Sequence, residues 1–179
     1  MAFSSDEEFV LSGFGLLTRK PQLILLNVAE GDERPAEELA GKQGEGVLVR
    51  TLQGDIEMEI AQLSPEEEVE FLAEYGIEKP GRERVIQASY DLLQLQSFFT
   101  VGEDEVRAWT TSRSATALEA AGTIHSDLER GFIRAEVIAW GELLELGGLS
   151  EARKQGRLRT EGKTYPVQDG EVVHIRFNI

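Results

Sequence analysis

The sequence predicts two consecutive segments of different fold class, an α/β segment over residues 1–92 and an α+β segment over residues 93–179. In the first segment, two apolar runs of strand length flank a stretch that proline can open as a helix, the order of a βαβ unit. In the second, several strand-length runs are grouped around short helices. Charge divides the chain at the same place. Residues 1–92 hold 8 basic and 20 acidic side chains, a net charge of −12, whereas residues 93–179 hold 10 and 13, a net charge of −3.

The composition is that of a folded, soluble protein and excludes several classes of function. Of the 179 residues, 41% are hydrophobic and 28% are charged. No apolar run approaches the roughly 18 residues that span a bilayer. The net charge of −15 argues against non-specific binding to DNA or to anionic membranes. The absence of cysteine excludes disulfides and thiolate metal sites. Together with the lack of a signal-peptide pattern at the start, it favours a cytoplasmic protein.

The opening residues predict a short capped helix. Ser4 or Ser5, followed by Glu7, has the pattern of a capping box. Apolar residues then recur at helical spacing until Pro21, which disfavours helix in the residue before it. This apolar stripe consists of Phe9, Val10, Phe14 and Leu17.

Two continuous apolar runs predict strands that are buried on both faces, as in a parallel sheet. They are residues 23–27 and 47–52, and Pro35 can open a helix over residues 35–41 between them. Strand, helix and strand in this order predict a right-handed βαβ unit.

Three more helices are expected before residue 93. The first covers residues 54–63, the second runs from the N-cap Ser64 to Gly76, and the third opens at Pro80. The apolar residues expected to face inward on the third helix are Val85, Ile86, Tyr90 and Leu93.

The second segment predicts a hairpin followed by strands that alternate with short helices. The expected strands are residues 95–101, 106–111, 132–139, 158–160, 163–167 and 171–177. The expected helices are residues 116–121, 124–129, 141–146 and 150–155. Strands packed around a central helix in so short a segment indicate an α+β fold.

No catalytic residue and no metal site is predicted. The chain lacks the phosphate loop GxxxxGKS or GxxxxGKT, and it lacks GxGxxG, HExxH, GxSxG and CxxC. Its two histidines, His125 and His174, are far apart in sequence. His125 with Asp127 is either a polar cluster at a helix start or a direct ligand or RNA contact. His174 is interpreted as a half-exposed strand residue.

Two places are candidates for binding. Asn27-Val28-Ala29-Glu30 follows a predicted strand, where open α/β sheets bind ligands, although an Asn there is also a common turn former. The second is a basic run that includes one acid, Glu161, and either holds phosphates or forms a solvated face. Its members are Arg153, Lys154, Arg157, Arg159 and Lys163, and Arg107, Arg113, Arg130 and Arg134 belong to the same segment.

Stretches along nearly the whole chain resemble the YchF branch of the Obg-like P-loop ATPases, in the family's order. In the first segment they are GLLTRKP (residues 15–21), NVAE (27–30) and EMEIAQL (57–63). In the second they are VRAWT (106–110), AAGTIHSDLERGFIRAE (120–136), EGKTYPVQDGE (161–171) and the terminal RFNI (176–179). The chain is thus similar to the carboxy-terminal part of these proteins.

The resemblance implies a fold, a cofactor and partners. Residues 1–92 would be the carboxy-terminal portion of an OBG-type G domain, and residues 93–179 a TGS domain, a ubiquitin-like β-grasp module. The family comprises ribosome-associated ATPases of the translation-factor GTPase class, which implies ATP with Mg²⁺ and a ribosomal RNA partner. Its NxxE form of the guanine-reading motif falls on Asn27 and Glu30, so Asn27 and the backbone of Val28 would contact the adenine base. The basic run would contact RNA.

The family's phosphate loop, both switch regions and most of its coiled-coil arm precede Gly15, and this chain has none of them. Phosphoryl transfer depends on that loop and its magnesium ion, so the chain alone is predicted to hydrolyse no ATP. Its two strands are also expected to expose apolar faces or edges.

Three interpretations of function stay open. The retained NxxE favours the carboxy-terminal portion of a YchF-type ATPase, whose working unit includes the missing part. The capped start at Ser4, directly after Met1, favours a stand-alone TGS-type module that docks on RNA or the ribosome without nucleotide chemistry. The third is a decayed fragment without function.

Overall fold

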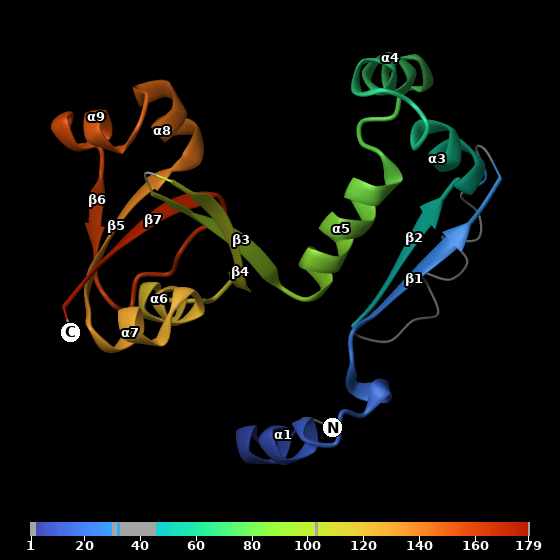
Figure 1. Ribbon diagram of the computed structural model, residues 1–179. Helices are drawn as coiled ribbons and strands as arrows, with labels where there is room; N and C mark the ends of the chain where they lie inside the picture. Colours follow the sequence, from blue (N-terminus) through green and yellow to red (C-terminus); the bar gives the residue numbers. More distant parts are fainter. Residues whose placement is uncertain (1–2, 30–31, 33–45, 103, 179) are drawn as a thin grey trace. The chain divides into compact units, whose positions relative to one another are not determined.

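The computed structural model describes residues 3–29, 32, 46–102 and 104–178. The chain forms two compact units, Met1–Leu93 and Gln94–Ile179, which are considered separately below (Figure 1). The helix expected over residues 35–41 lies outside the described residues.

The first helix, α1 (Ser5–Ser12), has the expected capping box, in which Glu7 N donates to Ser4 Oγ and the Glu7 carboxylate accepts from Ser4 N. It ends at Gly13, well before the expected stop, and a 3₁₀ turn η1 (Leu17–Arg19) follows. The apolar stripe is therefore split between two elements. Its side chains are largely exposed, 81% for Phe9 and 82% for Leu17.

The predicted parallel strands are present as β1 (Gln22–Asn27) and β2 (Val47–Leu52), paired in register. The expectation that they are buried on both faces is wrong for this structure. Their residues are half-buried or exposed, and Leu25 is 43% exposed. Helix α5 (Gly81–Leu92) lies along the strands and packs against both of them (Figure 1).

The remaining helices of the first unit follow their sequence signals closely. Helix α3 (Gly54–Ile60) is three residues shorter than expected, whereas α4 (Pro65–Tyr75) begins at a Ser64 capping box and ends at Gly76 in the left-handed conformation. On α5 the buried residues are Gly81 and Ala88. Ile86 and Leu93, which were expected to face inward, are more than half exposed.

The second unit is built on one mixed sheet of five strands. The strands are β3 (Leu95–Val101), β4 (Val106–Ser112), β5 (Phe132–Ala139), β6 (Arg159–Glu161) and β7 (Glu171–Phe177). Their order across the sheet is β4-β3-β7-β5-β6. Strands β3 and β7 are parallel, and the other pairs are antiparallel. The last strand of the chain thus lies at the centre of the sheet.

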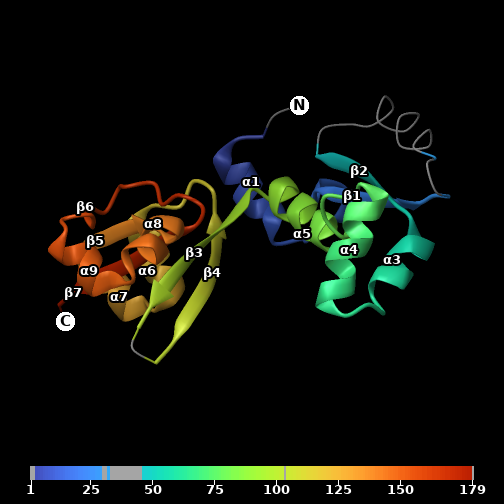
Figure 2. The same ribbon diagram turned by 90° about the horizontal axis from the view of Figure 1, so that it is seen from above.

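Helices cover both faces of this sheet (Figures 1 and 2). Helices α6 (Ala117–Ile124) and α7 (Ser126–Arg130) lie on one face, and α8 (Trp140–Leu146) and α9 (Leu149–Lys154) on the other. A core of Phe98, Val137, Val173 and the α6 alanines fills the first layer, and a smaller core around Ile138 and Leu143 fills the second. None of the described helices has the length and hydrophobicity of a membrane-spanning segment.

The strand expected over residues 163–167 is wrong. The segment forms a turn with one isolated bridge, from Pro166 to Thr116. Its carbonyl groups instead accept from the start of α6, since Ala117 N donates to Tyr165 O (2.8 Å) and Leu118 N donates to Lys163 O (3.2 Å). The backbone of this segment therefore pairs with the first turn of α6 rather than with a neighbouring strand.

Candidate functional site

Asn27 ends β1 and ties the strand to the next loop. Its Oδ1 accepts from the Gly54 backbone N–H at 2.9 Å, at the start of α3. A Cβ atom at residue 54 would lie 2.9 Å from this same oxygen, so Gly54 allows the close approach. The Asn27 side chain therefore holds the start of α3 at the carboxyl ends of both strands. That edge is where open α/β sheets bind ligands.

The backbone at Val28 is partly used by the fold. Its N–H donates to Leu52 O at 2.9 Å, which extends the pairing of the two strands by one residue. This N–H is therefore already used in the pairing of the strands. Glu30, the last residue of the NxxE pattern, lies outside the described residues.

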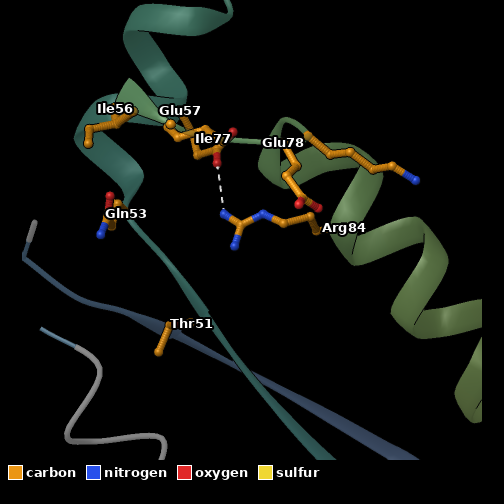
Figure 3. A pocket seen from close by; sticks show the side chains of 9 residues that line it. Thr51, Gln53, Ile56, Glu57, Ile77, Glu78 and Arg84 are labelled. Carbon is orange, nitrogen blue, oxygen red and sulfur yellow. Dashed lines mark hydrogen bonds and ion pairs between the residues drawn. The ribbon is translucent and has the colours of Figure 1, made fainter. Parts of the chain in front are cut away.

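A hollow of about 330 Å³ lies next to this edge, beside the end of β2 (Figure 3). Its lining comes from the end of β2, from α3, from the connection between α4 and α5 and from the start of α5, and it includes Thr51, Gln53, Glu78 and Arg84. Asn27 and Val28 are not part of this lining. The hollow and the strand edge are therefore distinct places that share the loop at Gln53.

Glu57 closes one side of the hollow and fixes the start of α5. Its carboxylate accepts from Gly81 N at 2.7 Å and from Arg84 Nη2 at 3.2 Å, the contact drawn in Figure 3. A Cβ atom at residue 81 would lie 2.3 Å from Glu57 and 2.4 Å from Leu52, so only glycine fits there. No ligand is needed to explain Glu57, because its carboxylate satisfies a backbone N–H in the first turn of α5.

The basic run of the second unit is largely paired with carboxylates. Arg153 pairs with Glu136 at 2.9 Å and Lys154 with Glu151 at 3.3 Å. Arg157 pairs with Glu142, and Arg159 with Glu171 and, at 3.1 Å, with the Tyr165 hydroxyl. Lys163 is exposed. The run is therefore not an open basic face in the folded chain, and its side chains lie on both faces of the sheet.

Sequence reasoning did not single out Glu136 and Arg176, which lie with Arg153 in a cluster. Arg176 Nε donates to Glu136 Oε1 at 3.2 Å, and the Glu136 side chain is 10% exposed. Burial alone would raise the pKa of Glu136. The hydrogen bonds and charges of Arg153 and Arg176 outweigh burial and hold that pKa below its usual range. Strand alternation could have signalled the cluster, because charged residues stand at 134 and 136 and again at 174 and 176.

The two histidines have different surroundings. His125 is the N-cap of α7, where its Nδ1 accepts from Asp127 N at 3.1 Å, which favours the helix-start interpretation. His174 lies opposite Glu136 in the sheet. Burial lowers the pKa of His174, and the charges of Arg176 and Arg153 lower it further. No group of three or more metal-binding side chains occurs in the part of the chain that the structure describes.

Comparisons with known proteins match the whole chain to one family. The family model described as "YchF-GTPase_C: Protein of unknown function (DUF933)" matches residues 95–178. The "Ribosome-binding ATPase YchF" of Haemophilus ducreyi is 46% identical over 185 residues, covering 100% of this chain and 50% of that protein. The protein of the same name from Bacillus subtilis is 46% identical over 184 residues, covering 99% and 50%. The chain spans about half the length of these curated relatives.

Solved structures agree with this match. The Schizosaccharomyces pombe YchF GTPase superposes with a TM-score of 0.80 at 27% identity, covering 98% of this chain and 48% of that one. A GTP-binding protein from Pyrococcus horikoshii OT3 superposes with a TM-score of 0.62 at 19% identity, which shows a shared fold. In sequence and in fold, this chain belongs to the YchF family and matches its carboxy-terminal half.

Proposed function

We propose that the chain supplies the ribosome-docking part and the base-reading edge of a YchF-type ATPase, without the phosphate site. The observation that carries the proposal is the match to ribosome-binding ATPases over the full chain but only half of their length. ATP with Mg²⁺ belongs to the intact protein in this proposal. The proposed place for the base is the strand edge at Asn27.

The second unit is proposed to be the family's TGS domain, residues 93–179, and the first the end of its OBG-type G domain, residues 1–92. The strand order β4-β3-β7-β5-β6, with a parallel central pair and α6 packed across one face, supports a ubiquitin-like β-grasp. A parallel strand pair with a helix on it supports a piece of an α/β nucleotide-binding sheet.

For the first unit, Asn27 and Val28 are proposed to contact the adenine base, with Glu30 of the same NxxE pattern supporting them. Asn27 offers an acceptor, which Gly54 N–H already uses, and the Nδ2 donors of its amide. Asn27→Asp keeps an acceptor for Gly54 and removes the donors, whereas Asn27→Ala removes both. The two variants therefore separate base reading from loop pinning.

Amide chemical shifts during titrations with adenosine, ATP and guanosine test this role. Adenosine and ATP are expected to shift Val28 and Gly54 equally and weakly, because the phosphates have no site, and guanosine is expected to shift neither. Asn27→Asp should lose the response. If ATP binds much more tightly than adenosine, or if the chain hydrolyses ATP, the proposed absence of a phosphate site is wrong.

Ribosome docking is proposed for the second unit, with Arg153, Lys154, Arg157, Arg159 and Lys163 as the candidate RNA-contact set. Their carboxylate partners must be exchanged for phosphates, so the expected salt dependence of binding is modest. Cosedimentation with ribosomes at increasing salt measures it. Unchanged affinity after charge reversal at Arg153, Lys154 and Arg157 would remove this set from the proposal.

A stand-alone docking module without nucleotide chemistry is the second candidate function. It is favoured by the second unit, which encloses its own core on both faces of a complete sheet. Adenosine titration distinguishes the two candidates, because a docking module alone predicts no response at Val28 and Gly54.

A further inference from the structure

Three arginine side chains converge on one buried carboxylate in the second unit. Arg153 Nη2 lies 2.9 Å from Glu136 Oε2, Arg176 Nε lies 3.2 Å from Glu136 Oε1, and Arg134 Nη2 lies 4.0 Å from the same Oε1. These three residues around Glu136 are called the arginine cluster. It holds three positive charges and one negative charge, an excess of two positive charges.

The cluster lies on the face of the sheet that carries α8 and α9. Side chains alternate between faces along a strand, so Glu136 shares the face of Ile138, which belongs to the core beneath α8 and α9. His174 is its cross-strand neighbour on β7, and Arg153 comes from α9 itself. The cluster therefore lies on the same face of the sheet as the core beneath α8 and α9, and its arginine side chains are exposed.

The arginine side chains are both fixed and accessible. They are between 43% and 53% exposed, whereas Glu136 is 10% exposed. A guanidinium has five donors, and a carboxylate accepts about four hydrogen bonds in all, so one Glu136 cannot engage every donor of three arginines. A buried anchor that holds exposed guanidinium groups in place reduces the ordering cost of binding an anion.

The lowered pKa of His174 agrees with a positive field at the cluster. Burial is the largest cause, and the charges of Arg176 and Arg153 act in the same direction against one opposing carboxylate, Glu136. The basic run differs in this respect, because Lys154, Arg157 and Arg159 each face a carboxylate of their own. The cluster therefore has three arginines for one carboxylate, whereas these three residues of the run have one carboxylate each.

We propose that the arginine cluster binds backbone phosphates of RNA and forms the contact through which the second unit docks on ribosomal RNA. Planar guanidinium groups suit this role, since they bind phosphate oxygens in a bidentate manner. The proposal rests on the ribosome docking proposed above. It shares Arg153 with the candidate RNA-contact set and adds Arg134 and Arg176.

The test compares two single substitutions that each remove one positive charge. Arg134→Gln leaves Arg153 and Arg176 to satisfy Glu136, so the fold is retained. Arg130→Gln is the matched control, because Arg130 lies on α7, on the other face of the sheet, and its side chain is 74% exposed. Binding of the full chain to oligouridylate and, separately, to purified ribosomes is measured at several salt concentrations. Thermal unfolding confirms that each variant is folded.

Arg134→Gln is expected to weaken oligouridylate binding about fivefold and to reduce the salt slope by roughly 0.7, the contribution of one single-strand phosphate contact. The Arg130→Gln variant is expected to bind like the parent chain. The proton signals of His174, titrated with and without oligouridylate, should show a higher pKa in the complex, because bound phosphates add negative charge beside it. A purely structural cluster would not move this value.

Each other outcome has a definite meaning. Equal loss in both variants, or no loss in Arg134→Gln, overturns the proposal. A parent chain that binds oligouridylate but not ribosomes contradicts the proposed docking and leaves the phosphate site standing. A parent chain that binds neither contradicts both.

Discussion

The two units form their helices by the same local signals but differ in the core that those helices enclose. Capping boxes start α1, α4 and α6 alike. In the first unit, however, the buried hydrophobic residues among those described are Ile60 and Ala88, whereas the second unit buries two clusters on the two faces of a five-stranded sheet. Local signals are thus sufficient for single helices. A core also requires elements that pack on the faces of the sheet, as α6 and α8 do in the second unit.

The largest expected difference is in cooperative unfolding. Residues 94–179 produced alone should unfold in one transition at the same temperature as in the full chain, because their cores are internal. Residues 1–93 produced alone should show no sharp transition, because their strands are half-buried or exposed. Differential scanning calorimetry of the three proteins measures this. A single transition of the full chain that disappears when the units are separated would mean that the units stabilise each other.

Core truncations sharpen the comparison at single residues. Phe98 is 0% exposed, and Phe98→Ala is expected to destabilise the second unit by about 3–5 kcal/mol. Ile60→Ala is the corresponding change in the first unit and should leave the second unit's denaturant midpoint unchanged. Urea unfolding followed by Trp109 and Trp140 fluorescence measures both, since both tryptophans belong to the second unit. A midpoint shift in Ile60→Ala would show coupling between the units.

A smaller effect is expected at the buried carboxylate of β7. Glu171 is 4% exposed and accepts hydrogen bonds from the Tyr165 hydroxyl (2.7 Å), from Gln168 N (3.0 Å) and from Arg159. Glu171→Gln should cost about 1–3 kcal/mol, because it replaces one acceptor oxygen by a donor. The control is Glu142→Gln at the more exposed pair with Arg157, where about 0–1 kcal/mol is expected. Equal costs would contradict the assigned difference in burial.

The smallest expected effect is a pH dependence from His174. Its folded pKa lies below its unfolded value because of burial and the charges of Arg176 and Arg153, opposed by Glu136. Between the two pKa values the unfolded state binds more protons, so stability is full above the unfolded pKa and falls as the pH drops through this window. Urea midpoints across the window measure the slope. His174→Gln should flatten it, and an unchanged slope would assign the dependence to other groups.

Much of the fold follows from sequence patterns that act locally. Ser64 with Pro65 and Gly76 fixed both ends of α4, and the run at residues 47–52 coincides with β2. The hairpin, β5 and β7 agree with the expected strands within a residue. These signals depend on near neighbours in the chain, so the sequence alone contains them.

The errors arise where distant residues decide the outcome. Residues 163–167 have strand composition but bond to the start of α6, and nothing local distinguishes these two possibilities. The residues of the basic run are close together in sequence. In the fold they lie on both faces of the sheet, and carboxylates from other elements pair with them. The arginine cluster was missed for the same reason, since Arg134, Arg153 and Arg176 come from three separate elements.

The most direct test of docking through the second unit is amide hydrogen exchange of the full chain with and without purified ribosomes. The account predicts that ribosomes protect β5, β7 and α9, the elements that carry the arginine cluster, and leave α1 and α4 unchanged. Protection confined to the first unit, or no change anywhere at saturating ribosomes, would contradict it.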